Sequence, residues 1–539
     1  MKNNTKIYIF LIILLFASLY RVGSWGVTET SEARYAEISR EMSIDNDVVH
    51  PKLLHIQHFD KPPVTYVVTA LMMKMMGPTD FAARFSLQLL FILQIFLLYK
   101  IAMIFYKNED IAFFTSVIYA TLPLVLFSVR GLTTDAFVNT FVLLSIYFQT
   151  KYLQTGKRHW QYYFAVVMGV NFLTKGPVGL IVPLILYLPI KKHFKSRTGF
   201  SIHTIISLLI FFLISLSWYL VLIHENHQFL NYFVYKHTIE RFTNAQVFSR
   251  HEPWWYFWVL FPLTTLPWIV FILMRLQHVK NHKINFMVLI YWIVIPLIFF
   301  SISSSKRILY VLPLTGGVAL IAGEIFSSAQ KGADKYFRGV LFYFLSIFFG
   351  LFFGLSSYQM LDGDMNISFG AILFFLMFAG SAIYLMKKKN MGIKSKNLWL
   401  SISYIVFFLP FSTHLMSANN DILNSSNNIA QFIRSDVGQN VNVLVYDRLL
   451  PSLSFELDKP IYSIYKKHRV LKRETQFEKN NSFKKYYINI NKKNDVGYLK
   501  KLLQKKYTLI SRNKITENMK WLIRNTSQHK KIGKWYIYY

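Results

Sequence analysis

The chain has 539 residues, of which 53% are hydrophobic and 16% are charged, a composition typical of a polytopic membrane protein. It contains no cysteine, which excludes disulfides, thiolate metal sites and thiol nucleophiles. The formal net charge is +33, but many basic residues lie in short loops between apolar segments, others lie near the C-terminus, and no nucleic-acid-binding motif accompanies them. We therefore expect no nucleic-acid partner.

Apolar segments of membrane length recur from the N-terminus to about residue 415. We count about thirteen, allowing for short or tilted ones, and predict an all-α polytopic membrane domain over residues 1–416. Because further spans follow, the first segment is interpreted as an uncleaved anchor instead of a signal peptide. The predicted spans are Ile7–Tyr20, Phe81–Phe105, Ile111–Val129, Thr133–Thr150, Trp160–Leu173, Val178–Ile190, Ile205–Ile223, Trp254–Met274, Phe286–Ser301, Ile308–Ser327, Phe337–Ser356, Phe369–Met386 and Leu398–Leu415.

One more apolar run, Val64–Met76, decides the orientation. If this run does not span, the loops on one side become strongly basic, as in Lys151–His159, Lys191–Arg197 and Lys387–Lys396. Lys and Arg accumulate on the cytoplasmic side of membrane proteins. We therefore predict a cytoplasmic N-terminus and a surface or re-entrant helix at Val64–Met76. The loop Trp25–Tyr66 and the C-terminus are then on the outer, periplasmic face of a bacterial inner membrane.

Residues 417–539 have a different pattern, in which helical and strand periods alternate. We predict a small α/β extracytoplasmic domain there. It has no glycine-rich phosphate loop and no cluster of His and carboxylates, so support or partner contact is expected of it more than chemistry. The predicted helices are Asn428–Asp436 and Val496–Lys506, and the predicted strands are Val441–Tyr446, a pair within Ser452–Tyr465, Lys485–Ile490, Tyr507–Ser511 and Trp535–Tyr539.

The loop at residues 25–66 is charge-dense although it lies between apolar runs. Ser31 is a candidate N-cap for a helix over Glu32–Met42. One face of this helix is apolar and the other carries charges, which also fits a plain interfacial helix with solvated charges. Asp60-Lys61-Pro62-Pro63 is more specific, because the prolines stiffen the turn that holds Lys61.

Further charges lie at the outer ends of predicted spans. Asp135 begins one span, where it can serve as a first-turn helix acid or, at membrane depth, as a functional carboxylate. Lys175 lies between two short spans, and Lys306 and Arg307 follow a serine run. Cations converging from several outer loops, with carboxylates among them, predict a site for an anionic phosphate with a base nearby.

Several blocks in this order resemble a known family. They are SEARYAEISREM, HFDKPP, LTTDAF, LTKGP, YFVYKHTIERF with HEPWWYF, and SSSKRILYVLP, and they extend from Trp25 to about Pro313. Together they resemble the C-type integral-membrane glycosyltransferases, most closely the lipid A aminoarabinose transferases and their protein O-mannosyltransferase relatives.

The resemblance implies inverting transfer from a sugar on polyprenyl phosphate to lipid A, another glycolipid or a protein. No cofactor is expected beyond a divalent metal that assists at most. The implied phosphate-binding residues are Arg34 and Lys61, with Lys175 or Lys306 assisting, Arg307 alongside and Tyr310 lining the site; the implied metal positions are His237 and Asp60.

One departure concerns the base. Where the family has Asp-Glu before Ala-Arg-Tyr, this chain has Ser31-Glu32, and where the family has Glu before the lysine of the turn, it has Asp60. We expect Asp135 to be the first candidate for the catalytic carboxylate, with Glu29 and Glu32 as alternatives.

A lipid transporter or flippase would share this topology. It would be expected to carry charges within its spans, paired across internal repeats. No repeat is found, and the charges lie at the outer rim. A non-catalytic scaffold would leave Asp135 and Lys61 without a purpose. Within the enzyme class, protein O-glycosylation is the alternative to glycolipid modification.

Overall fold

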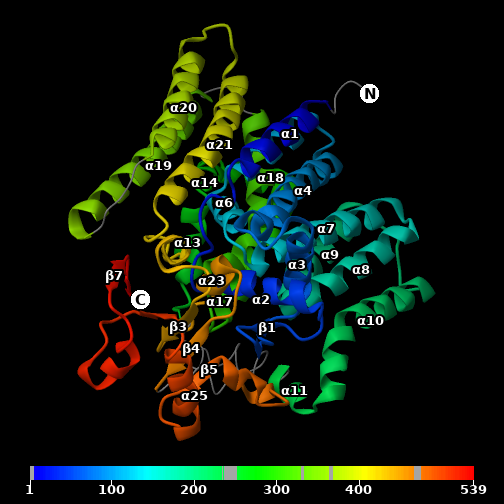
Figure 1. Cartoon of the computed structure of the whole chain (residues 1–539). Coiled ribbons are helices and arrows are strands. Elements are labelled where there is room, and N and C mark those ends of the chain that lie inside the picture. The colour runs from blue at the N-terminus through cyan, green and yellow to red at the C-terminus, as the bar shows by residue number, and fades with distance from the viewer. Residues whose placement is uncertain (1–4, 234, 236–251, 329–332, 363–367, 467–474) are drawn as a thin grey trace.

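The protein is a large helical bundle with a small sheet-containing part at one end (Figure 1). The computed structural model describes residues 5–233, 235, 252–328, 333–362, 368–466 and 475–539. His237, one of the residues predicted to hold a metal, is outside the described residues. Helix α2 (Ser31–Asp45) lies between the bundle and the sheet.

The bundle follows the predicted apolar segments closely. Its first part contains α1 (Thr5–Leu19), α4 (Asp80–Tyr106), α5 (Glu109–Ala120), α6 (Pro123–Arg130), α7 (Thr134–Thr155), α8 (Arg158–Lys175), η1 (Gly176–Leu180), α9 (Ile181–His193), α10 (Ile202–Glu225) and α11 (Gln228–Leu230). Its second part contains α13 (Tyr256–Thr264), α14 (Trp268–Met274), α15 (Leu276–Asn281), α16 (Lys283–Val288), η4 (Leu289–Val294), α17 (Ile295–Ile302), η5 (Ile308–Leu314), α18 (Thr315–Ser328), α19 (Ala333–Asp362), α20 (Phe369–Lys387) and α21 (Ile393–Ala418).

Fewer helices than predicted are long enough to cross a membrane. Among the described residues there are seven such segments, or up to nine if each bent pair is one span, so the count of about thirteen is not confirmed. Several apolar segments are short or broken. The α5–α6 pair bends by 57° where Pro123 cannot donate a backbone hydrogen bond, and α13–α14 bends by 105°.

Helix α3 (Val64–Met76) has the predicted bounds, and it is too short to cross a membrane by itself. Its 13 residues extend over about 20 Å, less than the ~30 Å hydrocarbon core. It packs between α2 and α4. The prediction that Ser31 caps α2 is wrong, because the helix already begins at Ser31 and Thr30, at the N-cap, makes no side-chain cap bond. The Glu32 carboxylate instead accepts a hydrogen bond from the backbone N–H of Thr28 at 3.0 Å.

The C-terminal part forms the α/β unit that the sequence predicts. Its sheet has the strand order β5-β4-β3-β6-β8-β7, in which β5, β4, β3 and β6 are parallel and β8 and β7 are antiparallel. The elements are α22 (Asn427–Phe432), η6 (Ile433–Val437), β3 (Asn442–Tyr446), α23 (Pro451–Leu457), β4 (Tyr462–Tyr465), η7 (Thr475–Phe477), η8 (Ser482–Lys485), β5 (Tyr487–Asn489), α25 (Lys493–Leu503), β6 (Tyr507–Ser511), η9 (Glu517–Ile523), β7 (His529–Ile532) and β8 (Trp535–Tyr538).

One strand assignment is wrong. The predicted strand pair within Ser452–Tyr465 is helix α23 followed by the single strand β4. Pro451 begins the helix, where its missing N–H costs nothing, and Asp458 ends it in the left-handed conformation. Strand β7, with Lys530 and Lys531 at its centre, was not predicted.

The α2–α3 loop and the C-terminal part share one hydrophobic core. Ile38 and Met42 of α2 pack with residues of β3, α23 and β8. The short hairpin of β1 (Lys52–Leu53) and β2 (Ile56–Gln57) contributes Leu53 and Ile56 to the same cluster. The loop that carries the candidate site residues is therefore held between the bundle and the sheet.

Candidate active site

A cavity of about 520 Å³ lies where the turn before α3 meets the bundle. Most of its wall is apolar and comes from α8, η1, α9, α10 and α17. The polar contributions are Asp60 and Lys61 from the turn, Lys175 from α8, and Ser303, Ser305 and Tyr310 from the segment after α17. The cavity therefore combines a long apolar surface with cationic and hydrogen-bonding groups.

The backbone around Lys175 explains why this side chain reaches the cavity. Lys175 is the last residue of α8, and Gly176 follows it with φ of 75°, a conformation that residues with a side chain rarely adopt. The chain turns there into the 3₁₀ segment η1, whose residues Pro177 and Val178 line the cavity. Glycine at position 176 thus lets the helix end with its lysine at the cavity wall.

Asp135 and Lys175 form a buried ion pair across α7 and α8. Their side chains are 13% and 7% exposed, so water screens the pair only weakly. The Lys175 Nζ also lies 4.3 Å from the centre of the Tyr310 ring, which is cation–π geometry. Asp135 is in the first turn of α7, as predicted, and it reaches the cavity wall through Lys175.

Asp60 belongs to a second polar cluster beside the turn. Its Oδ2 lies 3.8 Å from Nη1 of Arg34 and 3.7 Å from Nε2 of His58. The Tyr232 hydroxyl donates to its Oδ1 at 3.4 Å. Arg34 is thus connected to the cavity through Asp60 and is not part of the lining.

Tyr35 connects α2 to the start of α7. Burial raises the pKa of its hydroxyl to about 12, and the negative charge of Asp135 adds to the shift. The Tyr35 and Tyr66 rings stack at 5.4 Å. The proximity of Tyr35 to Asp135 places α2 next to the Asp135–Lys175 pair.

The other two candidate carboxylates bind elsewhere. Glu32 holds Arg84 of α4 at 2.8 Å and accepts from the Leu132 backbone N–H at 3.1 Å. Glu29 accepts a hydrogen bond from the Ser452 backbone N–H at 2.8 Å, and burial raises its pKa to about 6. Neither residue lines the cavity, and both tie the loop to neighbouring elements.

The remaining predicted cations lie beside the cavity. Lys306 is buried and donates to the backbone carbonyl of Glu252 at 2.9 Å, whereas Arg307 is exposed. Both lie between Ser305 and Tyr310, which do line the cavity.

Of the two residues predicted to hold a metal, Asp60 is the one within the described residues. Near Asp60, His58 is a second side chain of a type that can bind a metal, and its Nε2 lies 3.7 Å from the Asp60 Oδ2. No group of three or more His, Cys, Asp or Glu side chains suited to a metal occurs within the described ranges.

Sequence reasoning missed the aromatic side of the cavity. Tyr219, Phe233 and the neighbouring Phe229 and Tyr232 form a cluster with Phe59. In the sequence, Tyr219 belongs to an apolar span, Tyr232 and Phe233 belong to the block YFVYKHTIERF, and the pattern alone assigns none of them to the site. The spacing of Phe229, Tyr232 and Phe233 at i, i+3 and i+4 was the available signal for a shared face.

Comparison with known proteins agrees with this geometry. Residues 60–218, from the Asp60 turn to α10, match the family described as dolichyl-phosphate-mannose-protein mannosyltransferase. A relative from Proteus mirabilis, named undecaprenyl phosphate-alpha-4-amino-4-deoxy-L-arabinose arabinosyl transferase 2, is 29% identical over 60% of this chain and 60% of its own length. The transferase of similar name from Photorhabdus laumondii is 28% identical over 78% of this chain and 75% of its own. The chain thus spans about 60% of the length of the first of these relatives.

A solved structure shares the fold along nearly the whole chain. The crystal structure of ArnT from Cupriavidus metallidurans bound to undecaprenyl phosphate superposes with a TM-score of 0.76 at 18% identity, covering 99% of this chain and 98% of that one. The chain therefore has the fold of the C-type integral-membrane glycosyltransferases. Its sequence blocks and the named relatives make it similar to the aminoarabinose transferases of that class.

Proposed function

We propose that this chain is a glycosyltransferase that moves a sugar from a polyprenyl-phosphate donor to lipid A or another glycolipid. The observation that carries the proposal is the cavity, whose apolar wall suits a prenyl chain and whose Lys61 and Lys175 suit a phosphate. The names of the relatives specify undecaprenyl phosphate and an aminopentose as the donor, which supports pentosyl transfer here. Those relatives match more of the chain than the protein mannosyltransferase family does, which favours a lipid acceptor over a protein.

The phosphate of the donor lies against Lys61, Lys175 and the Tyr310 hydroxyl. The bond between the anomeric carbon and the phosphate oxygen breaks, and the lipid phosphate leaves with its negative charge. Lys61 and Lys175 stabilise that charge, with Arg34 keeping the turn in place through Asp60. Stabilising developing charge in a site shielded from water is usually the largest contribution to catalysis.

Asp135 is the base in this mechanism. An oxygen of the acceptor attacks the anomeric carbon from the side opposite the phosphate, so the configuration inverts. In the free protein, Lys175 pairs with Asp135. When Lys175 turns to the donor phosphate, Asp135 becomes available to take the proton from the acceptor oxygen, which typically contributes about 10²–10⁴-fold.

The same proposal fixes the orientation in the membrane. The basic loops between α7 and α8 and between α9 and α10 are cytoplasmic, as is the N-terminus. Helix α8 runs from such a loop at Arg158 to Lys175 at the cavity, so the cavity opens at the outer face of the inner membrane. Residues 417–539 are then a periplasmic domain, and residues 25–66 form the outer loop that carries part of the active site.

Mass spectrometry of lipid A and of envelope proteins tests the function. Cells carry the wild-type gene, no gene, Asp135→Asn, or Asp110→Asn, which changes a carboxylate that is 64% exposed at the start of α5. We expect a sugar-sized mass on lipid A with the wild-type and Asp110→Asn genes, and at least a 100-fold slower appearance with Asp135→Asn. A gene-dependent sugar mass on proteins would mean that the acceptor is a protein instead of lipid A. No gene-dependent mass on lipid or protein would contradict the proposal.

A further inference from the structure

A short C-terminal segment, Thr475–Lys479, contacts the outside of the cavity wall. It comes from the sheet-containing part of the chain, far in sequence from the turn and from α10. Phe477 is buried at 8% exposure in an aromatic cluster with Phe59, Trp218, Tyr232 and Phe233. This cluster is the place where the C-terminal part touches the residues that enclose the cavity.

Phe477 makes defined ring contacts on several sides. Its ring stacks on Phe229 with centroids 4.2 Å apart and an angle of 12°, and it meets the Tyr232 ring edge-on at 4.8 Å. It also meets the Phe59 ring at 5.6 Å and 89°. Phe59 lines the cavity and is followed directly by Asp60 and Lys61.

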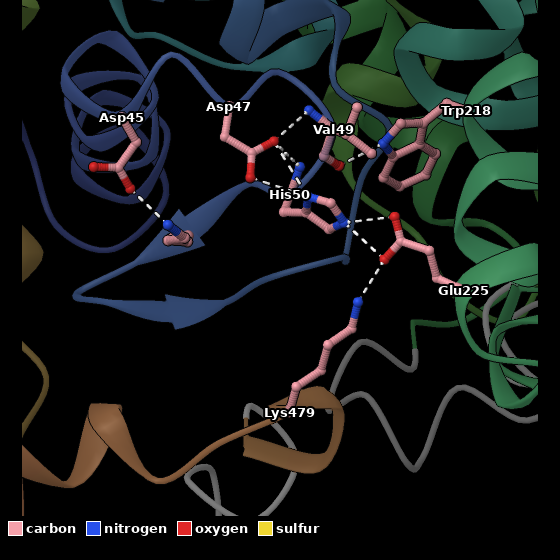
Figure 2. Close-up of polar contacts among 8 residues, drawn as sticks. Asp45, Asp47, Val49, His50, Trp218, Glu225 and Lys479 are labelled. Carbon is pink, nitrogen blue, oxygen red and sulfur yellow. Dashed lines mark hydrogen bonds and ion pairs between the residues drawn. The ribbon is translucent and has the colours of Figure 1, made fainter.

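The next two residues make polar contacts to the turn and to α10. The Glu478 carboxylate accepts a hydrogen bond at 2.6 Å from the backbone N–H of Gln57, two residues before Phe59. The Lys479 Nζ lies 2.9 Å from Oε2 of Glu225, the last residue of α10. Figure 2 shows Glu225 between Lys479 and the imidazole of His50, whose other nitrogen meets Asp47.

Consecutive residues of one segment therefore bind the turn, the end of α10 and the helix after it. Trp218, which donates to the Val49 carbonyl at 2.8 Å, joins α10 to the loop from the other side (Figure 2). The backbone leading to Lys61 is thus fixed against α10 by groups that do not line the cavity themselves. Of the residues contacted, Phe59 lines the cavity itself, and Glu225 and Phe229 lie on helices that contribute other lining residues.

We infer that Phe477 is a positioning residue, assisted by Glu478 and Lys479. It holds the turn so that Lys61 can bind the donor phosphate. The inference rests on the proposed function, because it assigns Lys61 to the donor. Lys479 is 66% exposed, so its ion pair is the weaker part, and the buried Phe477 ring is the main part. Misplacing a binding group by about 1 Å can cost up to about 10²-fold in rate, so a loosened turn has a measurable consequence.

The experiment compares Phe477→Ala with Phe477→Leu and with the control Phe483→Ala. Phe483 packs in the C-terminal part against the core shared with α2, without a described contact to the aromatic cluster. Purified proteins are assayed for the KM of an undecaprenyl-phosphate sugar, the KM of lipid A and kcat. Amide hydrogen exchange of residues 57–63 is measured on the same samples.

We expect Phe477→Ala to raise the donor KM about tenfold with an unchanged acceptor KM, and to speed exchange across residues 57–63. Phe477→Leu should recover most of the donor KM, and Phe483→Ala should change neither quantity. Equal effects of Phe477→Ala and Phe483→Ala would overturn the inference.

If Phe477→Ala does not accumulate in the membrane, the experiment uses Lys479→Ala instead. Its control is Lys484→Ala, which changes an exposed lysine of the same part of the chain. A faster exchange of residues 57–63 in Lys479→Ala alone supports the inference, and identical exchange in the two variants overturns it. Should the wild-type protein transfer no sugar, the proposed function fails. The exchange measurement then still decides whether this segment positions the turn.

Discussion

The two ends of the loop at residues 25–66 carry charges that have different surroundings. At the first end, Glu32 is 4% exposed and is satisfied by Arg84, which is fully buried and donates to the backbone carbonyls of Trp25 and Gly26. At the second end, Asp60 and Lys61 line a cavity of about 520 Å³. The first end holds the fold together, and the second end faces the cavity.

The contrast shows that charge density alone does not identify the reactive groups. The middle of the loop resembles its first end, because Arg40 and Glu37 pair at 2.8 Å with side chains that are 3% and 0% exposed. Burial and the negative charge of Glu37 raise the pKa of Glu41 well above its usual value. A charged side chain in this loop is a candidate for chemistry only where it faces the cavity.

The largest expected effect is on the first end. Glu32→Ala leaves the Arg84 guanidinium buried without its carboxylate, and breaking a buried ion pair typically costs about 3–5 kcal/mol. We expect a lower thermal unfolding midpoint and less protein in the membrane. Both can be measured on detergent-solubilised protein and by immunoblot.

Glu517→Ala is the control for Glu32→Ala, since the Glu517 side chain is 81% exposed and pairs with Lys520 at the surface. It should leave stability unchanged. A Glu32→Ala protein that is as stable as the wild type but inactive would return Glu32 to the list of catalytic carboxylates and remove the distinction between the two ends.

The next effect is on the second end. Lys61→Ala should lower transfer by about 10²–10³-fold, the range found when one group that stabilises developing charge is removed. Protein level and unfolding midpoint should stay near those of the wild type, because the turn is also held by Pro62, Pro63 and Phe59. The loss is measured as the rate of sugar transfer per molecule of purified protein.

Lys52→Ala tests whether the loss in Lys61→Ala reflects position or only charge. Lys52 lies in the same loop but pairs with Asp45 at 2.6 Å, with its side chain 32% exposed, and does not line the cavity. Its variant should keep normal transfer. Normal transfer by Lys61→Ala would refute the assignment of the phosphate to this turn.

The fold was predictable wherever local pattern and burial agree. Val64–Met76 and Tyr507–Ser511 have the bounds that periodicity gives them. Ser452–Leu457 does not, although its small polar and large apolar residues alternate as in a strand. Ser452 and Ser454 are both fully buried, so both sides of this segment pack, and the helix that begins at Pro451 is favoured.

The position of two candidate residues at the cavity was predictable for a related reason. Lys61 and Lys175 are cations at turn and helix-end positions marked by proline and glycine, and the structure places both at the cavity. The partners of Glu29 and Glu32 are Ser452 and Arg84, which are distant in sequence. Local pattern contains no information about those contacts, so the structural role of these carboxylates could not be foreseen.

The smallest expected effect concerns the contact between the first end of the loop and the C-terminal part. Burial, together with the negative charge of Asp80, raises the pKa of Glu456 to about 8, while its Oε1 accepts from the Val27 backbone N–H at 3.1 Å. The unfolded chain ionises this group near its ordinary value of 4.5, so the contribution of Glu456 to stability is most favourable below about pH 4.5 and is lost as the pH rises towards 8.

Glu456→Gln should remove this part of the pH dependence, because glutamine stays neutral and its carbonyl oxygen can still accept from Val27. We expect the variant to be more stable than the wild type at pH 8, with the difference vanishing near pH 4.5. Chemical unfolding between pH 4.5 and 8 measures both curves. Parallel curves would mean that Glu456 is ionised in the folded protein and that Arg84 neutralises this contact. The first end of the loop would then depend on charge pairing throughout, and its contrast with the cavity end would be one of ligand access alone.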